Sequence, residues 1–196
     1  YHDFPRAFFF HTVFGTTPLQ LCLMTAQIAN GGYKIKPKII VNDDPLSLED
    51  AKISMELQSL QTANTRLFKD QKNIKIVQEA MFSSTNEQYG TSYRSRIDDP
   101  KYQFAGKTGT AQVKRITESQ RELDLETYQI PYEERDHALY VAFAPYANPR
   151  YAMSIIVEHG GSGSKTAAPI AKELFKLIID RHEKREQVRK KKLEII

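Results

Sequence analysis

The sequence predicts a mixed α/β protein of the α+β type, in which an antiparallel sheet is flanked by helices. Three observations support this. Apolar residues make up 40% of the chain, which is enough for a packed core. Two strand-like runs, residues 137–144 and 151–158, are joined by a short turn. The predicted order is helix, helix, strand, hairpin, helix, which differs from the alternation of strands and helices that builds a parallel sheet.

Length and charge set limits on function. The chain has 196 residues, the size of one ordinary domain, with a net charge of +4 and a pI of about 9.0. Much of the excess lies in residues 181–196, so the body is nearly neutral and a nucleic-acid-binding protein is not expected. The single cysteine, Cys22, excludes an intrachain disulfide. No apolar run approaches the ~20 residues that span a bilayer, and the start lacks a signal-peptide pattern.

The first predicted helix covers residues 17–30. Thr17 is a good N-cap, Pro18 suits the first helical position, and Gln20 completes a capping box. Asn30-Gly31-Gly32 supplies the stop. The segment is apolar nearly all round, which predicts a buried helix with Cys22 packed as a small hydrophobe. No structure is predicted for residues 1–15.

The middle of the chain is less regular. Residues 33–41 are predicted to be extended, with Pro37 favouring a sheet edge or a connector, and residues 43–72 a polar surface connection. Residues 73–84 return to helical spacing, and their apolar stripe is interpreted as a core contact. The stripe consists of Ile74, Val77, Met81 and Phe82.

The second half contains the predicted sheet. Residues 102–113 form a strand, residues 114–136 a charged excursion, and the hairpin turns at Asn148-Pro149. A glycine-rich loop at 160–164 precedes an amphipathic helix at 166–182, with Pro169 in its first turn. Its predicted buried stripe is Ile170, Leu174, Leu177 and Ile178.

The strand at 102–113 contains Lys107-Thr108-Gly109-Thr110. Lysine offers a compact positive charge, and the threonine hydroxyls donate and accept hydrogen bonds. Gly109 lets a ligand backbone lie against the chain. These residues suit an anionic, peptide-like ligand that binds along a strand edge. The tripeptide alone leaves open an ordinary strand with a solvated lysine.

Several ordered blocks give this strand a context. The chain resembles the C-terminal part of the transpeptidase domain of class B penicillin-binding proteins of the cell-elongation type, over about residues 16–180. The blocks that carry the resemblance are Thr17-Pro18-Leu19-Gln20-Leu21, Ala29-Asn30-Gly31-Gly32, Ala105-Gly106-Lys107-Thr108-Gly109-Thr110-Ala111-Gln112, Asp136-His137-Ala138-Leu139, Ala142-Phe143-Ala144-Pro145, Val157-Glu158-His159-Gly160-Gly161 and Ala167-Ala168-Pro169-Ile170-Ala171.

The resemblance implies a peptidoglycan D,D-transpeptidase. In that family a serine attacks the bond between two D-alanines of a stem peptide, and an amine of a neighbouring stem peptide resolves the acyl-enzyme. The family's Ser-x-x-Lys and Ser-x-Asn motifs lie upstream of residue 16, so this chain is expected to lack the nucleophile and to be inactive alone. Residues 1–15 depart from the family pattern, and we hypothesise a broken reading frame or a truncated gene.

The resemblance also implies roles for the motif residues. Lys107 would add positive potential for catalysis, and Thr108 and Thr110 would bind the substrate carboxylate. The backbone N–H of Thr110 would donate in the oxyanion hole, and Gly109 would let the substrate add as a strand. No cofactor is expected. No zinc site is predicted either, because His137 and His159 lack a further ligand at metal spacing.

Two segments match family motifs by letter only. Ser162-Gly163-Ser164-Lys165 matches Ser-x-x-Lys but follows Lys-Thr-Gly and lies in the glycine loop, so we do not expect it to hold the nucleophile. Ser84-Thr85-Asn86 matches Ser-x-Asn but is interpreted as a helix end. Tyr93, Arg94 and Arg96 are interpreted as a solvated loop, with cleft lining as the alternative.

The expected partners are stem peptides ending in D-Ala-D-Ala and β-lactams. The full-length protein would also meet a SEDS-family glycosyltransferase and other elongation proteins, at the periplasmic face of the inner membrane. The basic tail is interpreted as a solvated helix end, with an anionic-lipid or nucleic-acid patch as the alternative. Competing functions are an inert remnant, a half-domain that needs complementation, a β-lactamase-like enzyme, and a small basic interaction protein. Uncovered apolar surface on the 17–30 helix would leave the isolated chain marginally stable.

Overall fold

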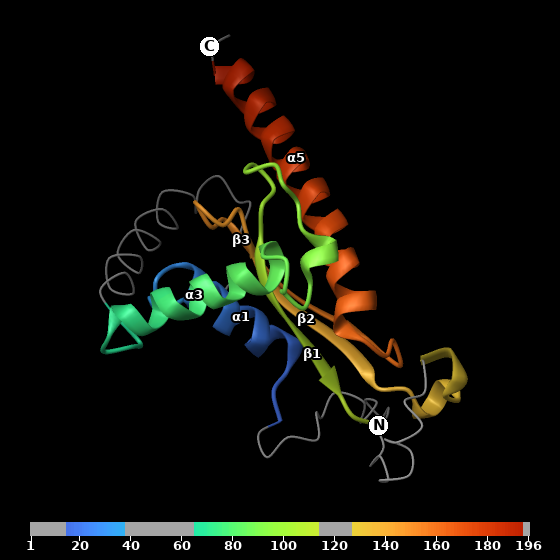
Figure 1. Cartoon of the computed structure of the whole chain (residues 1–196). Coiled ribbons are helices and arrows are strands. Elements are labelled where there is room, and N and C mark those ends of the chain that lie inside the picture. The colour runs from blue at the N-terminus through green and yellow to red at the C-terminus, as the bar shows by residue number, and fades with distance from the viewer. Residues whose placement is uncertain (1–14, 38–64, 114–126, 194–196) are drawn as a thin grey trace, which may run out of the picture.

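The computed structural model of the chain describes residues 15–37, 65–113 and 127–193 (Figure 1). The predictions for residues 1–14, for most of the 43–72 connection and for residues 114–126 therefore lie outside the described residues. Of the predicted extended segment at 33–41, the described part contains an isolated bridge between Tyr33 and Arg66.

A three-stranded antiparallel sheet forms the centre of the molecule. Its strands are β1 (Ala105–Ala111), β2 (His137–Ala144) and β3 (Tyr151–Val157), in the order β1-β2-β3. The register pairs Gly109 with Leu139 across β1 and β2, and Tyr140 with Ile155 across β2 and β3. The predicted antiparallel sheet and hairpin are confirmed, with β1 shorter than the predicted 102–113. Within this sheet β1 is an edge strand.

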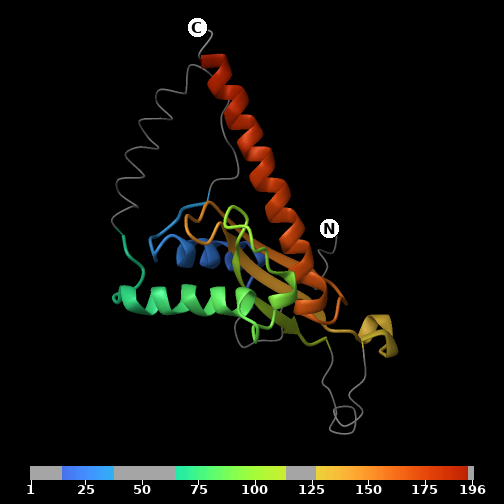
Figure 2. The ribbon, with the colours of Figure 1, turned by 45° about the horizontal axis from the view of Figure 1, so that its top comes forward.

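Helices cover both faces of the sheet (Figures 1 and 2). Helix α5 (Ala168–Leu193) lies on one face, which we call the α5 face. Helices α1 (Pro18–Ala29) and α3 (Gln71–Asn86) lie on the other, the α1/α3 face. Short helical turns connect these elements: η2 (Tyr93–Ser95), η3 (Thr127–Gln129), η4 (Tyr132–Glu134) and the π-helical turn η5 (Gly163–Ala167).

The α5 face holds the main core. Phe104, Tyr140 and Phe175 are fully buried there. The rings of Phe104 and Phe175 lie 5.3 Å apart, and those of Phe104 and Tyr140 meet edge-on at 6.3 Å. Between the aromatic rings the core is lined by alanines of β2, η5 and α5, which let the helix approach the sheet closely. These are Ala138, Ala142, Ala144, Ala167, Ala168 and Ala171.

The predicted buried stripe of α5 is wrong for three of its four residues, and the fourth, Ile178, is half-buried. Ile170, Leu174 and Leu177 are 40%, 37% and 62% exposed. The buried stripe is Ala168, Ala171, Phe175 and Ile179. Alanines occupy these positions because α5 lies so close to the strands that larger side chains would not fit. Apolar content alone therefore pointed to the wrong side of the helix.

Helix α5 also extends past the predicted end at residue 182 and continues to Leu193. Ion pairs bind the beginning of this extension and the turn before it to the body. Lys101 Nζ lies 3.0 Å from Asp180 and 2.8 Å from Glu183, and Arg150 pairs with Glu186 at 3.2 Å. Most described side chains beyond residue 182 are exposed, which agrees with a solvated helix end.

Helix α1 has the predicted cap but not the predicted burial. Thr17 Oγ1 accepts from Gln20 N at 3.2 Å, and Gln20 Oε1 accepts from Thr17 N at 2.7 Å. Only Thr25 and Ala29 are buried, whereas Leu19 and Met24 are 55% and 44% exposed. The helix covers β3 with one side, and no described element covers the other. The expected uncovered apolar surface is therefore present.

Cys22 lies on the packed side of α1. Its thiol is 3.5 Å from the carbonyl oxygen of Ala152 on β3, and partial burial raises the pKa of that thiol. A raised pKa keeps the sulfur protonated and unreactive, as expected of a small packed hydrophobe.

Helix α3 is longer than the predicted 73–84 and starts at the cap Asp70, whose carboxylate accepts from Lys72 N at 2.9 Å. Ile74 and Met81 are buried as predicted, but Val77 is 40% exposed, so that part of the stripe is wrong. Met81 packs with Ala105 of β1. The C-terminal end of α3 therefore lies beside the edge strand.

Candidate functional site

Strand β1 presents the Lys-Thr-Gly motif at the edge of the sheet. Side chains alternate along a strand, so Lys107 and Gly109 belong to the α1/α3 face, and Thr108 and Thr110 to the α5 face. Lys107 is exposed, and its Nζ donates to the carbonyl oxygen of Thr108 at 3.0 Å and lies 3.4 Å from its hydroxyl. The positive charge is thus held over Thr108.

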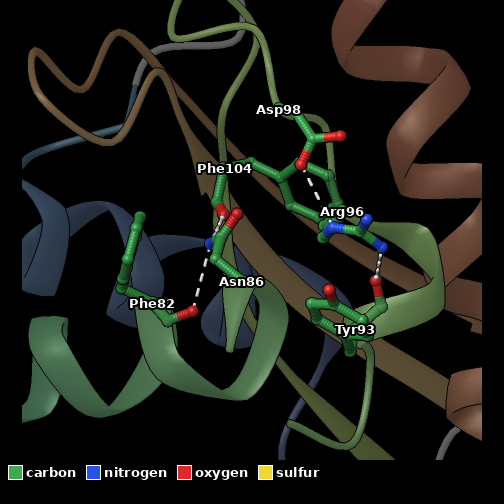
Figure 3. Close-up of polar contacts among 6 residues, drawn as sticks. All are labelled: Phe82, Asn86, Tyr93, Arg96, Asp98 and Phe104. Carbon is green, nitrogen blue, oxygen red and sulfur yellow. Dashed lines mark hydrogen bonds and ion pairs between the residues drawn. The ribbon is translucent and has the colours of Figure 1, made fainter. Parts of the chain in front are cut away.

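The outer edge of β1 is occupied at its beginning. Asn86 Nδ2 donates to the carbonyl oxygen of Phe104 at 2.9 Å and to that of Phe82 at 3.0 Å (Figure 3). One step along, Gly106 N donates to the hydroxyl of Thr85 at 3.1 Å. The last turn of α3 therefore takes the place of a fourth strand opposite Phe104 and Gly106.

Further along, no residue that the structure describes pairs with this outer edge. Backbone groups of alternate residues point to opposite sides of an antiparallel strand. Gly106 points away from β2, so the N–H and C=O groups of Thr108 and Thr110 point away from it too. Among the described residues, no backbone group outside the sheet accepts from the N–H groups of Thr108 and Thr110. The edge from Thr108 to Thr110 can accept an extended peptide.

A buried hydroxyl cluster supports the occupied part. The phenol oxygen of Tyr140 lies 2.9 Å from Thr85 Oγ1 and 3.0 Å from Ser92 Oγ. Burial raises the pKa of Tyr140, so the phenol stays neutral. Gly106 leaves the space that this cluster needs, because an added Cβ would lie 2.4 Å from the Tyr140 oxygen. The cluster joins α3, β1 and β2.

A second chain of hydroxyls reaches the motif itself. Ser84 Oγ lies 3.1 Å from Thr91 Oγ1, which lies 3.3 Å from Thr108 Oγ1. Ser84-Thr85-Asn86 is the end of α3, as predicted, and its side chains also contact β1. The contacts of Thr85 and Asn86 with β1 were not predicted from the sequence, nor was the contact of Thr91 with Thr108. No local pattern relates these residues to a strand some 20 positions away.

The π-helical turn supports the motif from the α5 face. A Cβ at Gly163 would lie 2.4 Å from the carbonyl oxygen of Leu139 and 2.5 Å from that of Gly109. The backbone of η5 therefore rests directly on paired residues of β1 and β2. Ser162 and Ser164 bond to each other at 2.9 Å in this segment, on the face of the sheet opposite to that of Lys107. Ser162-Gly163-Ser164-Lys165 therefore lies on the α5 face, to which Thr108 and Thr110 also belong.

The remaining predicted candidates make local contacts. Arg96 pairs with Asp98 at 3.1 Å and stacks 4.0 Å over the Tyr93 ring, which stabilises the loop before β1 (Figure 3). Arg94 is exposed. His137 Nδ1 accepts from His159 N at 2.9 Å. Within the described ranges, no three His, Cys, Asp or Glu side chains gather as metal ligands, and no helix has the length and apolar character to cross a membrane.

The comparisons with known proteins agree on one family. The family model for the penicillin binding protein transpeptidase domain matches residues 12–176. The peptidoglycan D,D-transpeptidase MrdA of Salmonella typhimurium is 33% identical over 167 residues, which cover 84% of this chain and 25% of that protein. MrdA of Haemophilus influenzae is 30% identical, covering 81% of this chain and 23% of that protein.

Solved structures give the same result. The penicillin-binding protein PBP2 of Helicobacter pylori, in complex with MreC, is 31% identical with a TM-score of 0.55, covering 83% of this chain and 25% of that one. PBP2 of Pseudomonas aeruginosa, in complex with WCK 5153, is 32% identical with a TM-score of 0.53, covering 80% of this chain and 29% of that one. The chain therefore spans about a quarter of the length of the relatives it matches.

Proposed function

The chain belongs to the penicillin-binding protein transpeptidase family, and from that premise we propose that it forms the substrate-binding wall of a peptidoglycan D,D-transpeptidase. The observation that carries the proposal is the open edge of β1 from Thr108 to Thr110, next to the exposed charge of Lys107. This edge offers main-chain hydrogen bonds to an extended peptide and a cation to its carboxylate. Residues 16–180 are the proposed part of the transpeptidase domain, and residues 181–196 its basic tail.

The stem peptide adds to β1 as a strand. Thr108 and Thr110 hydroxyls bind its terminal carboxylate, and Lys107 supplies positive potential to the carboxylate and to the proton transfers. Gly109 has no side chain, so the peptide lies close to the backbone of β1. The outward N–H of Thr110 donates to the oxyanion of the tetrahedral intermediate, a role typically worth about 2.7–4 kcal/mol.

The nucleophilic serine and its lysine base come from a segment outside these 196 residues. Ser162-Gly163-Ser164-Lys165 follows Lys-Thr-Gly in the chain and lies at the π-helical turn η5, which supports this assignment. The serine oxygen bonds to the carbonyl carbon of the penultimate D-alanine, and the terminal D-alanine leaves with a proton on its amine. The amine of a second stem peptide then displaces the serine, which regains its proton. β-Lactams acylate the same serine, and no step needs a cofactor.

The complete protein acts at the periplasmic face of the inner membrane, with peptidoglycan stem peptides and β-lactams as its ligands. The PBP2 of Helicobacter pylori that resembles this chain is described in complex with MreC. We propose that the complete protein binds a partner of that kind and a SEDS-family glycosyltransferase.

A fluorescent penicillin tests the proposal on the complete gene product. Lys107→Ala is expected to slow labelling by about a hundredfold, since a preorganised charge at the reacting group is worth that order of rate. Lys72→Ala is the matched control, because Lys72 is an exposed lysine on α3 away from the β1 edge. Equal labelling of the two variants, or no labelling of a folded wild-type protein, would refute the proposed function.

A half-domain that needs complementation is the second candidate. The exposed Leu19 and Met24 on α1 favour it, because they leave an apolar surface uncovered by any described element. In that case the 196 residues alone take no label, and adding the upstream half restores labelling. Labelling of the 196 residues alone would show that they contain the nucleophile. Rapid release of hydrolysed penicillin would instead favour a β-lactamase-like enzyme.

A further inference from the structure

The end of helix α5 projects past the sheet and has one side that no described element covers (Figures 1 and 2). On this side lie Leu177 and Val188, which are 62% and 56% exposed, with Arg181 and Lys184 between them. We call these four residues the exposed stripe. We propose that the exposed stripe is a docking site for an acidic amphipathic helix of another protein. The inference goes beyond the proposed function, because it concerns a partner and not the substrate.

The spacing of the exposed stripe is that of a helix–helix contact. Its successive members lie four, three and four positions apart, so they follow one line over about three helical turns. In packed pairs of helices, side chains with this spacing insert between the side chains of the other helix. The four residues also line a surface pocket, together with Asp180 and Arg185. A second helix therefore fits along the stripe.

The acidic side chains of this part of α5 contact the body of the protein. Asp180 and Glu183 lie 3.0 Å and 2.8 Å from the Nζ of Lys101. Glu186 lies 3.2 Å from the guanidinium of Arg150. Their negative charge is therefore balanced by residues outside the helix, and it is not available to the basic side chains of the exposed stripe.

The basic side chains lie on another side of the helix. Arg181, Lys184 and the neighbouring Arg185 are exposed, and none of them forms an ion pair with a described residue. Like charges on neighbouring turns repel one another, and nearby carboxylates relieve that repulsion. Positive charge and exposed apolar side chains are thus combined along one line. Charge complementarity selects an acidic partner.

Two other occupants fit the exposed stripe less well. A second copy of this chain would bring Arg181 and Lys184 against the same charges or against apolar side chains. A bilayer takes up an amphipathic helix through a continuous apolar side. Here the charged residues lie between Leu177 and Val188, so insertion would bury them. An acidic helix instead pairs the charges and covers both apolar side chains.

The test uses designed helical peptides of about three heptads, which bind to the complete gene product and are followed by fluorescence anisotropy. The acidic peptide has leucines along one line with glutamates beside them, and the basic peptide has lysines in place of the glutamates. A third peptide has the composition of the acidic one, with its leucines off the line. Wild type should bind the acidic peptide at least about tenfold more tightly than either of the others, and less tightly as salt rises.

Variants of the exposed stripe make the test specific. Lys184→Glu should weaken the acidic peptide by about tenfold, and the double variant with Arg181→Glu should prefer the basic peptide. Lys190→Glu is the matched control, because Lys190 is exposed on the same helix but lies off the stripe. Leu177→Gln should weaken the acidic peptide by about fivefold to tenfold without a change in charge. Thermal melting of each variant checks that it is folded.

The outcomes separate the occupants. Reversal of the preference by the double variant, together with a loss in Leu177→Gln, supports the inference. Equal losses in Lys184→Glu and Lys190→Glu, or no binding of any peptide by folded wild type, would overturn it. Tighter binding to vesicles of anionic phospholipid would overturn it in favour of a membrane, and a dimer that Leu177→Gln dissociates would do so in favour of a second copy. Penicillin labelling tests the proposed function separately, because the exposed stripe takes no part in it.

Discussion

The two faces of the sheet differ in how completely they are covered. On the α5 face, Phe104, Tyr140 and Phe175 are fully buried and alanines fill the space between them. On the α1/α3 face the core around Phe143 is smaller, and α1 leaves Leu19 and Met24 in solvent. The closed face holds the backbone of β1 in place, while the more open face is the one to which Lys107 belongs. One face of the strand is therefore packed against the main core, while its lysine is exposed on the other.

Phe175→Ala should have the largest effect, because it removes the centre of the closed face. Loss of a buried aromatic ring typically costs about 3–5 kcal/mol of unfolding free energy. Leu177→Ala, on the same helix but 62% exposed, should stay within about 0.5 kcal/mol. Chemical denaturation of the two variants measures the difference. Similar losses would show that α5 is not packed through the Phe175 side.

Gly163→Ala should have the next largest effect. Its new Cβ would lie 2.4 Å and 2.5 Å from two backbone oxygens of the sheet, which cannot move aside. We expect a loss of about 1–3 kcal/mol of stability, the usual result of overpacking. Gly109→Ala is the counterpart on the more open face, where the new Cβ would meet the Leu139 side chain at 3.2 Å. Gly109→Ala should lose less stability than Gly163→Ala. An equal or larger loss would contradict the conclusion that the α5 face is the more tightly packed one.

Alkaline pH should selectively weaken the closed face through Tyr140. Burial raises the pKa of Tyr140 above its unfolded value of about 10. A group whose folded pKa is raised contributes stability that is present below the unfolded pKa and is lost as pH rises above it. The melting temperature of wild type should therefore fall more steeply between pH 9 and 11 (on the order of the unfolded pKa) than that of Tyr140→Phe. Parallel profiles would show that the phenol is not desolvated.

Met24→Gln should have the smallest effect on stability, because Met24 is 44% exposed on the open side of α1. The unfolding free energy of the chain should change by less than about 0.5 kcal/mol. Light scattering should fall, since an exposed apolar residue is replaced by a polar one. A loss above about 1 kcal/mol would mean that this side of α1 is packed.

Much of the fold could be predicted because its signals are local. The cap at Thr17 and Gln20 depends on residues three positions apart and is formed as predicted. The hairpin follows from two strand-like apolar runs and the turn at Asn148-Pro149. The strand that contains Lys107 was also predicted, from the residues of its own segment.

The faces of the helices were harder to predict. The larger apolar residues of α5 were expected inside, yet the structure buries Ala168 and Ala171 and leaves Leu177 in solvent. Helical spacing identifies several possible stripes, and the distance between helix and sheet selects among them. That distance depends on β2, whose alanines lie some 30 positions away in sequence.

The sequence by itself determined the order of the elements, the caps of α1, the hairpin, and the presence of a cation and hydroxyls on one strand, because each depends on neighbouring residues. Only the tertiary structure decided which part of that strand is open. Next to Gly106, three separate segments contribute hydrogen-bonded side chains, which are Thr85, Ser92 and Tyr140. Their hydrogen bonds form once α3 and the sheet pack together, and no local pattern contains that contact.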